Sequence, residues 1–166
     1  MPEKSTIQRA RRDKREGKSP STQAGEFVHE EIEHVREGKH GARSTKQAIA
    51  IGLSKARRAG VDLPPPKKGS ARTRKSAKRD YAKGHGAGAT KKPSTRRSRA
   101  VTKALKREGH GAASKRALSK QARSASRKRS AASRSASARK AVRTKGPRER
   151  SAAARKAART RARGRR

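Results

Sequence analysis

The sequence predicts a mostly α-helical chain with extensive disorder: a short N-terminal helical hairpin, a degenerate second helical module and a long basic tail. Of its 166 residues, 51 are Lys or Arg and 12 are Asp or Glu, which gives a formal net charge of +39. Only 28% are hydrophobic and 1% aromatic. Low hydrophobicity with high net charge is typical of disordered segments. The bulky apolar residues follow a helical spacing in two short stretches near the N-terminus, which predicts the hairpin.

Charge and composition change along the chain. Residues 1–60 contain 14 Lys or Arg and 8 acids, whereas residues 61–166 contain 37 Lys or Arg and 4 acids. We therefore predict five segments: a basic N-terminal segment (1–19), a helical hairpin module (20–62), a Pro/Gly/Lys linker (63–92), a degenerate second copy of the module (93–124) and a Ser/Ala/Arg/Lys polycationic tail (125–166). Within the first segment, residues 5–16 have weak helical character and no apolar face.

Residues 20–38 are predicted to form the first helix of the hairpin. A serine or threonine just after the initial proline can accept hydrogen bonds from the first free amide groups. Phe27, Val28, Ile32 and Val35 follow one another at intervals of one, four and three residues, which is one helical stripe. Gly38 stands where a helix commonly ends in the left-handed conformation.

The second predicted helix covers residues 44–60. Ser44 and Gln47 have the spacing of a capping box, in which the side chain of each residue accepts a hydrogen bond from the backbone amide of the other. Ile49 and Leu53 lie four residues apart and share a face. A glycine followed by three consecutive prolines ends the helix. The five-residue loop between the two helices predicts an antiparallel pair.

The chain contains a predicted internal repeat. The Pro-Ser-Thr of residues 20–22 recurs at 93–95. The Arg-Glu-Gly of residues 36–38, followed by His-Gly-Ala at 40–42, recurs as Arg-Glu-Gly-His-Gly-Ala at 107–112. The second copy has lost most of the apolar stripe and nearly all acids, so we expect it to fold only against phosphate.

The tail consists almost entirely of Ser, Ala, Arg and Lys, and Gly146-Pro147 divides it. Ala, Arg and Lys favour helix intrinsically, but like charges oppose it, so we expect the tail to be disordered alone and partly helical on a polyanion. Its composition resembles the C-terminal tails of linker histones and of bacterial histone H1-like proteins.

A more specific resemblance lies in the first 63 residues. The run 37–56 reads Glu-Gly-Lys-His-Gly-Ala-Arg-Ser-Thr-Lys-Gln-Ala-Ile-Ala-Ile-Gly-Leu-Ser-Lys-Ala. It resembles a small bacterial domain family of unknown function whose members are often followed by a basic tail. The resemblance implies a bacterial source and a modular chain, and it implies no mechanism.

The net charge predicts a polyanionic partner, because each neutralised phosphate releases a condensed counterion. We expect a non-enzymatic, sequence-independent DNA-binding protein of histone-like, nucleoid-associated type in the bacterial cytoplasm, with duplex DNA favoured over RNA. An RNA-binding or ribosome-associated protein is the alternative. A third interpretation gives the hairpin a protein partner, or a second copy of itself, while the tail localises the chain to the nucleoid.

The predicted phosphate contacts begin at the start of the second hairpin helix, where a helix N-terminus attracts anions. They continue along the end of that helix, the second copy and the tail. The full set is Arg43, Ser44, Lys46, Lys55, Arg57, Arg58, Lys115, Arg116, Lys120, Arg123, Arg127, Lys128, Arg129, Arg139, Lys140, Arg155, Lys156 and Arg159.

Other functions lack a sequence signal. No nucleophile–base pair, phosphate-cradling glycine loop or cofactor fingerprint is present, so we expect no enzyme activity, cofactor or small-molecule substrate. There is no cysteine. His40, His85 and His110 each precede Gly-Ala without a neighbouring carboxylate, and His29 and His34 fall on different faces of an exposed helix, so we expect no metal site. No apolar run is long enough to cross a membrane.

Overall fold

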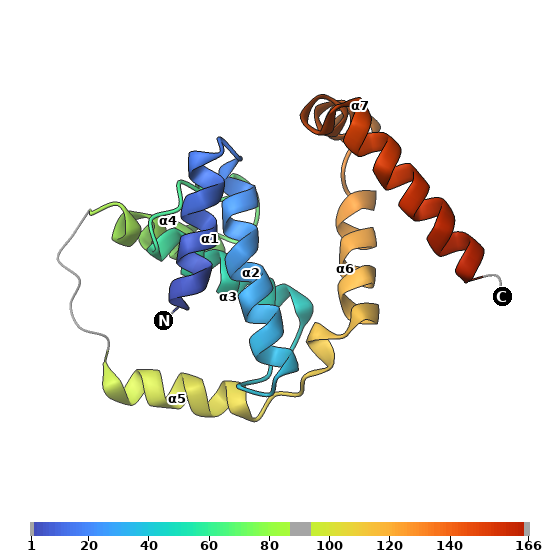
Figure 1. Ribbon diagram of the computed structural model, residues 1–166. Coiled ribbons are helices and arrows are strands. Elements are labelled where there is room, and N and C mark those ends of the chain that lie inside the picture. Colours follow the sequence, from blue (N-terminus) through green and yellow to red (C-terminus); the bar gives the residue numbers. More distant parts are fainter. Residues whose placement is uncertain (1, 87–93, 165–166) are drawn as a thin grey trace. The chain divides into compact units, whose positions relative to one another are not determined.

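The computed structural model describes residues 2–86 and 94–164 and divides the chain into two units, Met1–Gln121 and Ala122–Arg166. The first unit contains five α-helices and a 3₁₀ turn in its described part: α1 (Lys4–Arg15), α2 (Pro20–Arg36), α3 (Thr45–Arg58), α4 (Ala71–Gly84), α5 (Thr95–Lys106) and η1 (Gly111–Ala113). The unit boundary falls within α6 (Lys115–Arg127), and the second unit contains α7 (Ala131–Arg163). Figure 1 shows α1 lying alongside α2.

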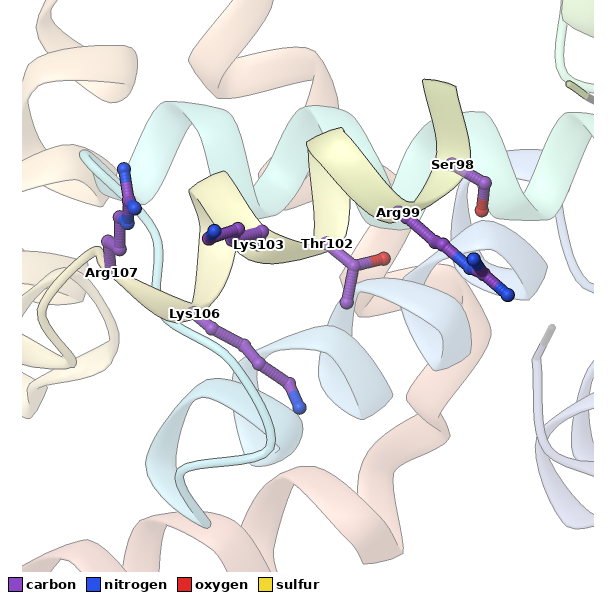
Figure 2. Close-up of a pocket in the computed structure, with 6 residues that line it drawn as sticks. All are labelled: Ser98, Arg99, Thr102, Lys103, Lys106 and Arg107. Atoms are coloured by element: carbon purple, nitrogen blue, oxygen red, sulfur yellow. The ribbon is translucent and has the colours of Figure 1, made fainter. Parts of the chain in front are cut away.

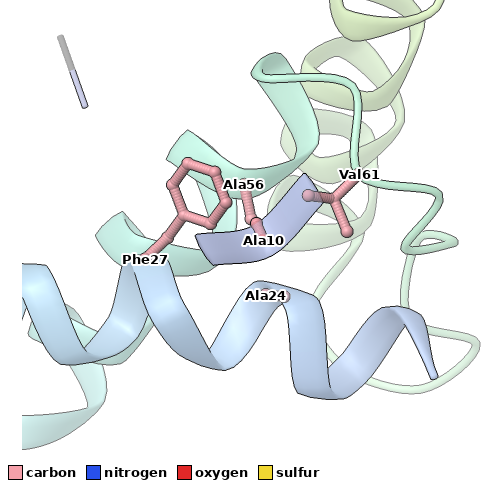
Figure 3. Close-up of a cluster of buried hydrophobic side chains, with 5 residues drawn as sticks. All are labelled: Ala10, Ala24, Phe27, Ala56 and Val61. Atoms are coloured by element: carbon pink, nitrogen blue, oxygen red, sulfur yellow. The ribbon is translucent and has the colours of Figure 1, made fainter. Parts of the chain in front are cut away.

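The first unit has a small apolar core between α1, α2 and α3. Figure 3 shows its buried side chains: Ala10 from α1, Ala24 and Phe27 from α2, Ala56 from α3, and Val61 from the segment after α3. Phe27 is 1% exposed. Because the other four side chains are small, Phe27 supplies most of the apolar surface that this core removes from water.

A second apolar cluster joins the other end of α2 to α3 and η1. It contains Ile32, Val35, Ala42, Ala48 and Ala113. Leu118, in the first turn of α6, packs against this cluster and is partly buried. The residues around position 113 therefore complete the core that the hairpin begins.

The two predicted hairpin helices are present as α2 and α3. The Ser44 side chain caps α3, since Oγ accepts from the Gln47 amide at 3.2 Å. The Gln47 side chain completes the cap one residue earlier than predicted, because its Oε1 accepts from the Arg43 amide at 2.9 Å. These two bonds satisfy amide groups that a helix start otherwise leaves free.

The predicted fold class is wrong in its extensive disorder. Residues 4–15 and 71–84 form helices that pack on the hairpin, and the basic tail is helical as well. The error arose because we looked for bulky apolar faces, whereas the packing surfaces of α1 and α4 consist of small and polar residues.

Helix α1 packs through short side chains. Thr6 and Ala10 are buried, and Ile7 is partly buried against the core. Asp13 is also buried and pairs with Lys18 Nζ at 2.8 Å. A buried carboxylate is tolerated there because its charge is compensated.

Helix α4 occupies part of the segment predicted to be a linker. Ser70 caps it by accepting from the Thr73 amide at 3.2 Å. Ala77 and Asp80 are its buried residues, and Asp80 Oδ2 accepts a 2.6 Å hydrogen bond from the Ser54 hydroxyl of α3. A hydrogen-bonded carboxylate thus makes the contact between α4 and α3 that a large apolar side chain would make in a more hydrophobic protein.

The tail forms helices because intrinsic propensity and capping agree there. Ser130 Oγ accepts from the Ser133 amide at 3.2 Å. The described side chains of α7 are almost all exposed, so its cations point outward all round the helix and stay hydrated. The predicted division is present, because Gly146 has φ +63° and interrupts the helical backbone before Pro147.

The loop between α2 and α3 pairs with the segment predicted to be its second copy. The amides of Gly41 and Ala42 donate to the carbonyls of Leu105 and Gly109 at 2.9 and 3.1 Å. The Thr45 hydroxyl donates to the Ala112 carbonyl at 2.6 Å. This segment was expected to fold only against phosphate, yet its backbone supplies acceptors to the hairpin.

Gly41→Ala should destabilise the first unit, because a Cβ at this position would lie 1.8 Å from the Glu108 carbonyl oxygen. We expect Gly25→Ala to act in the opposite direction and stabilise by about 0.5–1 kcal/mol, since Gly25 lies inside α2 with open space around it. Urea unfolding followed by circular dichroism compares the two. Equal urea midpoints for the two variants would show that the close contact between Gly41 and Glu108 does not contribute to the stability of the first unit.

Phe27→Ala should lower the free energy of unfolding of the first unit by about 3–5 kcal/mol, because it removes the largest buried side chain of the core. The matched control is Val101→Ala, since Val101 is 55% exposed and should change stability by less than about 0.5 kcal/mol. A core that does not depend on Phe27 would give the two variants similar denaturation midpoints.

Candidate nucleic-acid interface

The start of α3 keeps its predicted cations on the surface. Arg43, Ser44 and Lys46 are exposed, and the first turn of α3 contains no acid. The Ser44 hydroxyl oxygen already accepts from Gln47. The positive end of the helix dipole and the two flanking cations therefore remain available to an anion, with Ser44 acting as a cap.

The end of α3 behaves differently. Lys55 is 15% exposed and lies 2.7 Å from Glu31 Oε2, and Arg57 is buried. The Arg57 guanidinium donates to the carbonyls of Leu63 and Pro64 at 3.2 and 3.4 Å, and burial lowers its pKa. Both cations serve contacts inside the first unit, so we leave them out of the interface. Arg58 is about half exposed and faces Asp80 at 3.8 Å.

Four predicted residues form a stripe on α6. Successive residues of a helix are rotated by about 100°, so intervals of four, three and four residues place side chains within about 60° of one another. The exposed cations Arg116, Lys120, Arg123 and Arg127 have these intervals. The partly buried Leu118 lies on a different face. The stripe extends over about 16 Å of helix. Lys115 is exposed one residue before it.

Helix α5 carries a second basic face that sequence analysis did not include. Figure 2 shows the six side chains that line a shallow pocket on this helix, and four of them are cationic: Arg99, Lys103, Lys106 and Arg107. None of the residues of α5 is buried. The signal was available in the sequence, because Arg96, Arg99, Lys103 and Lys106 are spaced at three, four and three residues.

Helix α4 adds a third basic face, also missed because this segment was assigned to a linker. Arg72, Lys75 and Arg79 are exposed, whereas Ala77 and Asp80 are the buried residues that pack toward α3. Within the part of the chain that the structure describes, none of the stripe cations of α4, α5 and α6 pairs with a carboxylate.

In the second unit, most cations in the part of α7 after Gly146 lie on one side of the helix. Five cations, three of them predicted, fall within about 100° of the helix circumference: Arg148, Arg155, Lys156, Arg159 and Arg163. The cations before Gly146, including the predicted Arg139 and Lys140, are distributed around the helix. Arg129, predicted to bind phosphate, donates to the Ser133 carbonyl at 3.0 Å, and Lys128 beside it is exposed.

Some acidic and histidine side chains also come together. The groups Glu31–His34–His40 and Glu3–Glu30–His34 each have the composition and proximity that a metal ion requires. We expected no carboxylate beside His40, and the structure corrects this, since Glu31 Oε1 lies 3.4 Å from His40 Nε2. The contact was not readable from the sequence, because it depends on how the loop folds back over α2.

The sequence model of a family of unknown function (DUF6496) matches residues 11–68. This match confirms the predicted similarity of the first part of the chain to a family of unknown function, and it extends from the second half of α1 to the segment before α4. No curated protein and no solved structure matches the chain. None of the described helices is long and apolar enough to cross a membrane.

Replacing Arg116 and Lys120 together with glutamine should lower the slope of log K against log salt by about 2 in duplex binding, since each phosphate contact contributes about 0.9. The matched control is the Arg9→Gln, Arg12→Gln double variant. It removes the same charge, but Arg9 and Arg12 pair with Glu26 and Glu16 at 2.6 and 3.8 Å. Equal losses in the two variants would mean that only net charge matters.

Proposed function

We propose that this protein is a non-enzymatic, sequence-independent DNA-binding protein of histone-like, nucleoid-associated type, which holds the phosphate backbone through cationic faces on its helices. The observation that carries the proposal is the exposed stripe of four cations on α6, none of them paired with a carboxylate among the described residues. Similar faces on α4, α5 and α7 repeat the arrangement.

Segregation of charge supports the proposal. Eight of the twelve acids lie in residues 1–60, and many of them pair with lysines, arginines and histidines of the same region. The chain therefore neutralises its own charge where α1, α2 and α3 form a core. The cations elsewhere have few acids to meet and are left to an external polyanion.

The geometry favours a duplex. A stripe of about 16 Å corresponds to about five phosphates along one strand of B-DNA, at one charge per about 3.4 Å of axis. The major groove, about 12 Å wide, admits an α-helix. Stacking on single strands has little support, because Phe27 is buried and Tyr81 stacks on His85 at a centroid distance of 4.0 Å.

Competition binding tests the proposal. The nuclease-treated full-length protein is titrated with equal lengths of duplex DNA and structured RNA over a salt series. We expect duplex DNA to bind at least as tightly as RNA, with a slope of about −9 if about ten phosphates are contacted. A chain ending at Ser130, which lacks α7, should bind with a shallower slope.

A clear preference for structured RNA at matched salt would replace the DNA proposal with an RNA-associated role. A slope near zero would contradict phosphate binding altogether. Different DNA sequences of one length should bind alike, because no described helix presents a set of side chains suited to reading base edges.

A further inference from the structure

An anionic cluster lies inside this strongly cationic protein. The carboxylates of Glu3, Glu30 and Glu31 converge with the imidazoles of His34 and His40 where α2 meets the loop after it. The lysines that reach the cluster are Lys39, 3.3 Å from Glu3, and Lys55, 2.7 Å from Glu31. Lys39 is also shared with Glu37 at 3.0 Å, so the carboxylates in and beside the cluster outnumber its two ammonium groups.

The carboxylate of Glu31 is the part of this cluster that lacks its usual partners. The side chain is completely buried, and within the described residues neither of its oxygens accepts a hydrogen bond. Lys55 contacts Oε2 as an ion-pair partner, which leaves Oε1 facing His40. A buried acceptor without a hydrogen bond is costly, and it calls for a cation at Oε1.

The tautomer of His40 strengthens this argument. His40 Nδ1 lies 3.1 Å from the Gly41 carbonyl oxygen, and a carbonyl can only accept, so Nδ1 carries a proton. In the neutral ring, Nε2 then presents a lone pair to Glu31 Oε1 at 3.4 Å. Nε2 and Oε1 can therefore bind one cation together.

The spacing suits a metal ion better than a shared proton. A charge-assisted N–H···O bond is about 2.7–2.9 Å long. Ligand atoms around a tetrahedral zinc ion, at bond lengths of about 2.0–2.1 Å, lie about 3.3–3.4 Å apart. The separation of His40 Nε2 and Glu31 Oε1 matches the second geometry. A ligand nitrogen of His34 completes the group, with all three ligand atoms within 4.8 Å of one another.

We propose that Glu31, His34 and His40 form a binding site for one divalent transition-metal ion of the zinc class. Two imidazoles and one carboxylate are a common zinc ligand set, with water in the open position. Metal ligands are usually oriented by further hydrogen bonds and ion pairs. Here the Gly41 carbonyl contacts Nδ1 of His40, and Lys55 pairs with the second oxygen of Glu31.

Zinc titration of the full-length protein, nuclease-treated and stripped with a chelator, tests the site without any nucleic acid. Competition with a chromophoric zinc indicator should give one tight site per chain. His34→Gln and His40→Gln should each weaken it at least tenfold. The matched control is His29→Gln, which removes a 70% exposed imidazole from the same helix and should leave zinc affinity unchanged.

A second measurement needs no variant. In the wild-type protein, zinc should shift the NMR ring signals of His34 and His40, and leave those of His29, His85 and His110 in place. The site is contradicted if the wild type binds zinc no more tightly than the His40 variant, or if His29→Gln weakens binding equally. It is also contradicted if bound zinc shifts the other histidines instead. Circular dichroism of the metal-free variants checks that each remains helical.

Discussion

The close approach of α2 and α3 is the constraint on which the first unit depends. A Cβ on Gly52 would lie 2.7 Å from Val28 Cα and 2.9 Å from the Phe27 carbonyl oxygen, so the two helices meet backbone to backbone. At that separation, three alanines, Phe27 and Val61 form the buried cluster, with Ile7, Leu53 and Leu63 packed at its edge. A chain poor in bulky apolar residues can therefore form a core, provided that its helices carry very small residues where they meet.

Because α2 and α3 lie so close together, charged side chains between them lose contact with water, which costs free energy. Glu31 and Lys55 face each other across this interface, away from water. Taking both ions out of solvent is expensive, and losing either one would leave the other uncompensated. Most acids of this chain lie in residues 1–60 beside cations of the same region, and few acids accompany the cations that follow.

The parts of the fold that could be predicted were those with local signals. Val28, Ile32 and Val35 marked α2 by their spacing, and Ser44 with Gln47 marked the start of α3. Helices α1 and α4 could not be predicted from apolar periodicity, since α1 is joined to α2 by the Arg9–Glu26 pair and α4 to α3 by Asp80, whose partners depend on the tertiary fold. The disorder expected of the tail was wrong because repulsion between like charges was given more weight than the helix propensity of Ala, Arg and Lys.

The candidate interface divides along similar lines. The stripe on α6 was contained in the predicted residues, because intervals of three and four can be read directly from a sequence. Lys55 and Arg57 could not be separated from the surface cations, since only packing shows that they face inward. The cations of α4 were missed because their segment had been assigned to a linker. Those of α5 lie in the same predicted second copy as most of the α6 stripe, and the same spacing could have identified them.

The hydrogen bonds from Gly41, Ala42 and Thr45 to residues 105–112 show that the folded unit extends well beyond the segment matched by the family model. The family match covers residues 11–68, yet α1 begins at Lys4, and the acceptors of that loop lie some forty residues beyond the matched segment. The matched segment is thus shorter than the segment that satisfies its own backbone here. A fragment limited to residues 11–68 would leave these three donors without the acceptors that residues 105–112 supply.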